Sequence, residues 1–160
     1  MRATSLGVMA YVTAEARQDL LDALASATDD IGVALGALGD AYELLDETTA
    51  DQLEDLLFGP VQVAYGRAKR THSEFAERHG LARHAFASPP AGAPSHGVKG
   101  FLDLAVEAVE RADFALASLQ DSMMPVEVGD AELRAGMAAV RRQLSDVSAH
   151  ARQFMRGFGR

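Results

Sequence analysis

Apolar residues recur at alternating steps of three and four along four long segments of this chain. Such spacing gathers them on one side of an α-helix, as in the packed seams of helical bundles. No segment alternates between apolar and polar residues with a period of two, so no β-sheet is expected. The pattern predicts an all-α fold, a four-helix bundle with coiled-coil-like packing. The first and last stripes are Leu21, Leu24, Thr28, Ile31, Leu35, Leu38, Tyr42 and Leu45, and Leu133, Met137, Val140, Leu144, Val147, Ala151, Phe154 and Phe158.

Capping residues and helix breakers indicate where the helices begin and end. Thr13 and Asp130 are suited to cap the first and the last helix, and a capping box begins at Thr49. Gly80 suits the C-terminus of the second helix, and Pro60 predicts a kink or break within it. The predicted helices are about 13–47, 49–80, 97–123 and 130–157.

The connections between these helices divide the chain into two pairs. Only a few residues join the first two helices and the last two, so each pair is predicted to form an antiparallel hairpin. A Pro- and Gly-rich linker, 81–97, joins the hairpins and would reach about 50 Å in polyproline geometry. Such a linker either crosses the whole bundle, leaving the second and third helices parallel, or forms a loose loop at one end. The sequence leaves both paths open.

The whole chain, 1–160, is expected to be a single domain, since its length suits one hydrophobic core. Residues 1–12 are interpreted as a short leader that packs across one end of the bundle. A single positive charge and a central glycine make this segment a poor match to a signal peptide. No apolar run reaches the length of a membrane span, so we expect no membrane partner and a cytoplasmic location.

The composition argues against several functional classes. The chain has no cysteine, which excludes a disulfide framework, thiol catalysis and cysteine-ligated metals. Its 23 acidic and 15 basic residues give a net charge of -8, so no nucleic-acid partner is expected. No nucleophile elbow, phosphate loop or dinucleotide fingerprint occurs. We therefore favour a protein that is not an enzyme and expect no cofactor.

A metal site is the main chemical alternative. The long connection between the second and third helices resembles the topology of ferritin-like di-metal proteins, whose sites need Glu-x-x-His motifs. No such motif occurs here. The candidates for a divalent metal are instead His72, on an apolar stripe with Tyr65, and the pair Asp146 and His150 on one helix face. The carboxylates of the third helix that would complete such a site are Glu107, Glu110 and Asp113.

Three glycines in the first helix need a structural reason, because each costs about 0.8–1 kcal/mol against alanine in a helix interior. Gly32 and Gly36 form a small-xxx-small face, with Gly39 following and Val33 beside it, so this stretch is apolar nearly all round. Such a helix is buried on several sides. The third helix or a second copy of the chain would cover it. An exposed apolar area of this extent favours the second copy.

Together these observations favour a non-enzymatic protein that acts by protein–protein contact as a homodimer. An unidentified protein is a second candidate partner. The alternative is a bundle of ferritin-like topology that binds a metal or a small ligand without the usual motif. The predicted interface residues are Gly32, Val33, Gly36 and Gly39, and the candidate metal ligands are His72, Asp146 and His150.

Overall fold

The computed structural model describes residues 2–93 and 96–158, with side chains from Val12 onward. These residues form seven α-helices and one π-helical turn, and none of them lies in a β-strand. The prediction of an all-helical chain is confirmed. In chain order the elements are α1 (Arg2–Tyr42), α2 (Glu47–Leu53), η1 (Glu54–Phe58), α3 (Gly59–His79), α4 (Gly97–Asp121), α5 (Met124–Glu127), α6 (Ala131–Leu144) and α7 (Val147–Phe158).

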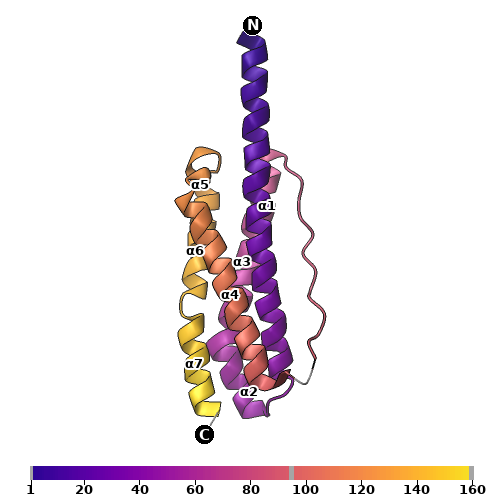
Figure 1. Ribbon diagram of the computed structural model, residues 1–160, viewed down its shortest axis with the longest axis vertical. Helices are drawn as coiled ribbons and strands as arrows, with labels where there is room; N and C mark the ends of the chain where they lie inside the picture. Colours follow the sequence, from indigo (N-terminus) through magenta and orange to yellow (C-terminus); the bar gives the residue numbers. More distant parts are fainter. Residues whose placement is uncertain (1, 94–95, 159–160) are drawn as a thin grey trace.

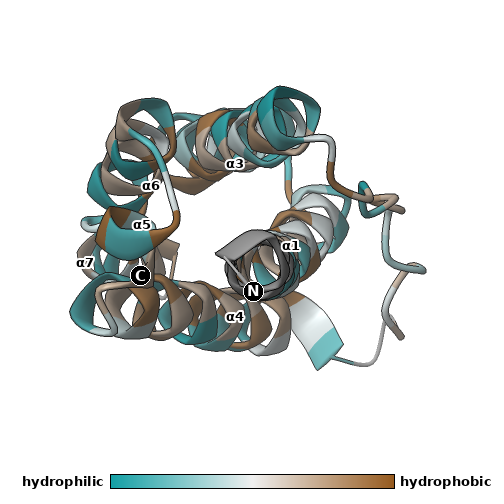
Figure 2. Cartoon of the chain, turned by 90° about the horizontal axis from the view of Figure 1, so that it is seen from above, coloured by the Kyte–Doolittle hydropathy of each residue, from teal (hydrophilic) through white to brown (hydrophobic). Residues whose placement is uncertain are grey.

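The helices form rods that lie side by side (Figure 1). α1 is the first rod, and α2, η1 and α3 follow one another without a break to form the second. α4 is the third rod, and α6 with α7 is the fourth. Seen from above, α1 lies next to α4 and α3 lies next to α6 (Figure 2). The apolar stripes of the rods meet in one core cluster that extends from Leu20 to Phe154.

The first helix is longer at its start than the sequence predicts. α1 begins at Arg2, not near Thr13, and it ends at Tyr42. The backbone of 2–12 therefore continues α1, which corrects the expected leader across the bundle end; Met1 lies outside the described residues. The start of α1 extends past the other rods (Figure 1). No proline interrupts this stretch, and a lone glycine costs a helix only about 1 kcal/mol, so nothing local ends the helix.

Two other helix boundaries differ from the prediction. Asp46 caps α2, because its carboxylate accepts the Thr49 N–H at 2.8 Å, so Thr49 lies in the first turn and is not the cap. The predicted fourth helix is divided into α6 and α7 at 145–146. There the Ser145 hydroxyl donates to the Arg142 carbonyl at 2.8 Å. Such a bond offers the backbone an alternative to the helical ladder.

The predicted disturbance at Pro60 takes the form of a π-helical turn. In η1 the Gly59 N–H donates to the Glu54 carbonyl, five residues back. α3 then starts with Pro60 in its first turn. A π-turn accommodates one extra residue without ending the helix. The second rod therefore remains continuous through the proline.

The predicted caps Gly80 and Asp130 are both found, and they join the end of α3 to the start of α6. Gly80 ends α3 with a left-handed φ of 63°. The Asp130 carboxylate caps α6 by accepting a hydrogen bond from the Leu133 N–H at 2.7 Å. It also accepts two hydrogen bonds from the Arg78 guanidinium, at 2.7 and 2.8 Å, and lies 3.0 Å from His79 Nε2. Burial alone would raise the pKa of Asp130, but these hydrogen bonds outweigh it and lower the pKa to about 2.

Residues 81–93, which we call the strap, run along the outside of α1 in the direction of that helix (Figure 1). Near its start, Ala82 exchanges two hydrogen bonds with Gln18. Near its end, the Gly92 N–H donates to Asp40 at 2.8 Å. From Gln18 to Asp40 a helix rises about 33 Å, so the strap travels much of the length of the rods. Figure 1 shows α3 and α4 running the same way, with the strap returning along α1 between them.

Gly136 on α6 allows a close approach to α3, and this generates a prediction. A β-carbon added at Gly136 would collide with the side chain of Thr71. We expect Gly136→Ala to lower the free energy of unfolding by about 1–3 kcal/mol, because the two helices must separate to admit the methyl group. The matched control is Gly66→Ala on α3, where an added β-carbon meets nothing within 4 Å and should stabilise the helix by up to about 1 kcal/mol. Urea unfolding measures the stability of both variants. Equal stabilisation by Gly136→Ala and Gly66→Ala would contradict a close approach of α6 to α3 at Gly136.

Candidate functional site

The outer face of α4 carries an exposed row that mixes apolar and charged side chains. Leu104, Glu107, Arg111 and Phe114 follow one another at steps of three, four and three, which places them on one side of the helix. They lie opposite the face of α4 that packs into the core. Phe114 is 75% exposed and Leu104 is 39% exposed. We call these four residues the α4 ridge.

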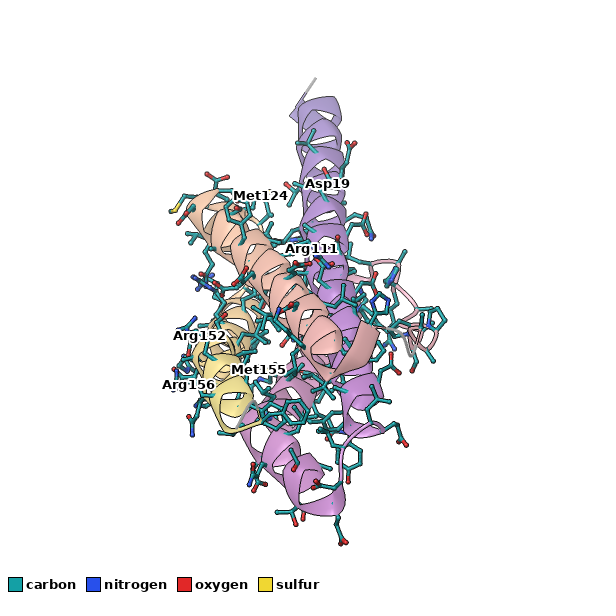
Figure 3. The ribbon with its side chains drawn as sticks, turned by 60° about the horizontal axis from the view of Figure 1, so that its bottom comes forward. Asp19, Arg111, Met124, Arg152, Met155 and Arg156 are labelled. Atoms are coloured by element: carbon teal, nitrogen blue, oxygen red, sulfur yellow. The ribbon has the colours of Figure 1, made fainter. Side chains whose placement is uncertain are left out.

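The two charged side chains of the α4 ridge make few ion pairs with the rest of the chain. The Arg111 side chain is half exposed, and its Nε lies 3.6 Å from Asp30 on α1. Figure 3 shows Arg111 on α4, on the side that faces α1. Among the described residues, Glu107 has no ion-pair partner within 4.0 Å. Other charges on α4 are paired at closer range, Lys99 with Asp103 and Asp113 with Arg141.

A hollow of about 340 Å³ lies beside the α4 ridge, between α4 and α7. Glu107 and Glu110 are on its α4 side. Arg152 and Met155, which Figure 3 labels, are on its α7 side. Because Glu107 belongs to both features, the hollow and the ridge form one continuous surface. The apolar side chains that line the hollow are Leu102, Val106, Ala151 and Met155.

The predicted interface on α1 is largely occupied by the chain itself. A β-carbon at Gly32 would meet the ring of Tyr65 at 3.1 Å, and one at Gly36 would meet Pro89 of the strap at 2.9 Å. At Gly39 the nearest such neighbour is Phe58, at 3.9 Å. These contacts give Gly32 and Gly36 a role in packing within one chain. Val33 faces outward and is 40% exposed.

The candidate metal ligands lie apart. His150 on α7 contacts Leu56 in η1, whereas His72 is on α3 beneath the strap. From Leu56 to His72 the second rod rises about 24 Å, so the two imidazoles do not converge. Asp146 is exposed at the break between α6 and α7. Among the side chains that the structure describes, in 12–93 and 96–158, no three His, Asp or Glu are grouped so that they could hold a metal ion.

The His150 imidazole instead fills a hydrogen-bonding vacancy left by Pro60. In an α-helix the N–H of residue 60 would donate to the Leu56 carbonyl, but proline has no N–H. The Nδ1 atom of His150 lies 3.0 Å from that carbonyl oxygen. Because a carbonyl only accepts, this contact requires the proton on Nδ1. Pro60 signals an unpartnered carbonyl in the sequence, but its donor is 94 residues away and leaves no local signal.

His72 is 1% exposed and is covered by the strap. Its Nε2 accepts the His84 N–H at 3.4 Å, and the ring of Phe86 meets it edge-on with centroids 5.0 Å apart. Its Nδ1 has no hydrogen-bond partner. Burial lowers the pKa of His72 from the ordinary value, and the nearby His84 lowers it further. The stripe position of His72 predicted its burial, but nothing in the sequence indicated that the strap would supply its neighbours.

Comparisons with family models, with curated proteins and with solved structures gave no match to this chain. Among the described residues, no helix combines the length and apolar character that a membrane crossing needs. The functional argument therefore depends on the chemistry and geometry of the surfaces described above.

The contact between His150 and Leu56 generates a second prediction. We expect His150→Ala to lower the free energy of unfolding by about 1–2 kcal/mol, because the Leu56 carbonyl loses its donor. In a Pro60→Ala background the loss should shrink, since residue 60 then has an N–H that can serve the same carbonyl. The control Gln153→Ala, exposed on the same helix, should change stability by less than about 0.5 kcal/mol. Equal losses for His150→Ala in both backgrounds, in urea unfolding, would contradict this role.

Proposed function

We propose that this protein is a non-enzymatic helical interaction module that pairs with a second copy of itself through the α4 ridge. The observation that carries the proposal is the symmetry of the ridge. Antiparallel pairing about a two-fold axis that crosses the ridge at the level of residue 109 sets Leu104 opposite Phe114 of the second copy. The same axis sets Glu107 opposite Arg111. Each contact occurs twice, as in the self-complementary interface of a two-fold dimer.

The apolar ends and the charged centre of the ridge would contribute differently. Burying an exposed phenylalanine stabilises an interface by about 1.5–3 kcal/mol, and the two-fold axis buries Phe114 twice. Exposed ion pairs contribute at most about 1 kcal/mol each, so Glu107 and Arg111 would mainly fix the register. The small residues Gly100 and Ser118, one step beyond each end of the ridge, would face each other under the same axis and allow close approach.

The surroundings of the ridge support this proposal. The hollow between α4 and α7, which both apolar and charged side chains line, extends the surface that a second copy would cover. The separation of His72 from His150 favours an interaction module over the metal-binding alternative. The proposal takes the rods as a four-helix bundle of two antiparallel hairpins, α1 with α2–α3 and α4 with α6–α7, joined by the Pro- and Gly-rich linker. In that arrangement the outer face of α4 is not covered by another rod.

Phe114→Asp tests the proposed surface. We expect the unchanged protein to sediment at twice the 17.0 kDa of one chain, and the variant to weaken the dimer at least about tenfold. The matched control is Val33→Asp, which places the same charge at an exposed apolar position on α1. It should leave the dimer intact. Loss of the dimer in Val33→Asp alone would move the interface to α1, and a wild-type monomer at every concentration would refute self-pairing altogether.

A charge exchange tests the register. Glu107→Arg and Arg111→Glu each set like charges opposite one another twice, so each should weaken the dimer by severalfold. The double variant Glu107→Arg/Arg111→Glu restores opposite charges in both places and should recover most of the affinity. Sedimentation velocity across a dilution series measures all four proteins, and circular dichroism melts verify that each is folded. A double variant that is weaker than either single one would contradict the antiparallel register.

A further inference from the structure

The strap is held against α1 and α3 by a short series of polar contacts. Ala82 and Gln18 exchange hydrogen bonds at 3.1 and 3.2 Å near its start, and Gly92 is bound by Asp40 near its end. Most of the residues between them are exposed, and none lies in a helix or a strand. The middle of the strap therefore depends on few contacts, and the most buried of them is with His72.

The central contact holds only while His72 is neutral. The Nε2 atom accepts the His84 N–H, which requires a lone pair on that nitrogen. The proton of the neutral ring then resides on Nδ1, which is buried without an acceptor. Protonation would place a second N–H on Nε2, directly toward the His84 N–H. Two donors would face each other, and a cation would be buried at a site that is almost closed to water.

Charged groups reach His72 from α1 and from the strap. Asp22 and Asp29 on α1 favour the protonated ring, whereas Arg83 and His84 on the strap oppose it. His84 has a separate effect, because its Nε2 lies 3.0 Å from Asp29 and that contact becomes an ion pair when His84 is protonated. A positive charge on His84 therefore strengthens the contact between the strap and Asp29, while it also places a positive charge beside His72.

We propose that the strap is an acid-released latch, in which protonation of His72 breaks the central contact and frees the middle of 81–93 from α1 and α3. Opening uncovers the small-residue face of α1 at Gly36, which Pro89 covers in the closed form. The latch is independent of the α4 ridge, which lies on another rod. The direction follows from linkage: His72 titrates at lower pH when the strap is closed, so closure is favoured above the ordinary histidine pKa and weakens as the pH falls through it.

Amide hydrogen exchange, corrected for the intrinsic effect of pH, tests the latch in the full-length protein. Between about pH 7.5 and pH 5, the protection of the 81–93 amides should fall, by up to about tenfold per pH unit for one proton, while core amides of α3 and α6 stay protected. His72→Phe should abolish this dependence. The control His96→Asn removes an exposed histidine outside the strap and should leave it unchanged.

A titration of His72 in the unaltered protein tests the same proposal without depending on whether the His72→Phe variant folds. The ring nitrogens of His72, followed by NMR in the unaltered protein, should titrate at a pH below the one at which strap protection begins to fall, because the closed strap lowers the pKa of His72. Strap protection that stays flat over this range, or that falls equally in a folded His72→Phe variant, would overturn the proposal. So would a His72 ring that titrates at or above the pH at which strap protection begins to fall.

Discussion

The return of the chain from the end of α3 to the start of α4 imposes the main constraint on this structure. Both helices run the same way, so residues 81–93 must travel back along the rods outside any helix. The N–H and C=O groups of such extended backbone need hydrogen-bond partners, because they belong to neither a helix nor a sheet. Gln18, Asp40 and the ring of His72 provide them. A histidine in the core and a carboxylate on α1 thus serve the backbone of a segment far away in sequence.

The start of the strap is fixed by the joint between α3 and α6. Gly80 turns the chain out of α3 with a positive φ, and directly before it Arg78 and His79 converge on Asp130. The hydrogen bonds to Asp130 hold its pKa near 2, so this joint keeps its charge throughout the range in which a histidine titrates. The end of the strap is equally constrained, since a β-carbon at Gly92 would collide with Phe101. Both ends are fixed, and only the middle depends on an imidazole.

The sequence predicted the parts of this fold that depend on local patterns. Apolar stripes identified all the long helices, and Gly80 and Asp130 marked true helix ends. The sequence singled out Gly32 and Gly36 as a close-contact face, and in the structure the neighbours of that face are Tyr65 and Pro89 of the strap. A helix that is apolar all round looks the same in sequence whether a second chain or a distant segment of its own chain covers it. The same limit applies to His150, whose acceptor Leu56 no local pattern could indicate.

Exposure alone would not distinguish Phe114, because isolated apolar side chains are common on protein surfaces and need no explanation. Val63 on α3 is 55% exposed, and we assign it no role. What sets the α4 ridge apart is order: apolar, acidic, basic and apolar side chains at helical spacing. When a second copy of the ridge runs in the opposite direction, each acidic side chain lies opposite a basic one and each apolar end lies opposite an apolar end. It is this symmetry, and not the exposure of Phe114, that supports the proposed pairing of the α4 ridge with a second copy.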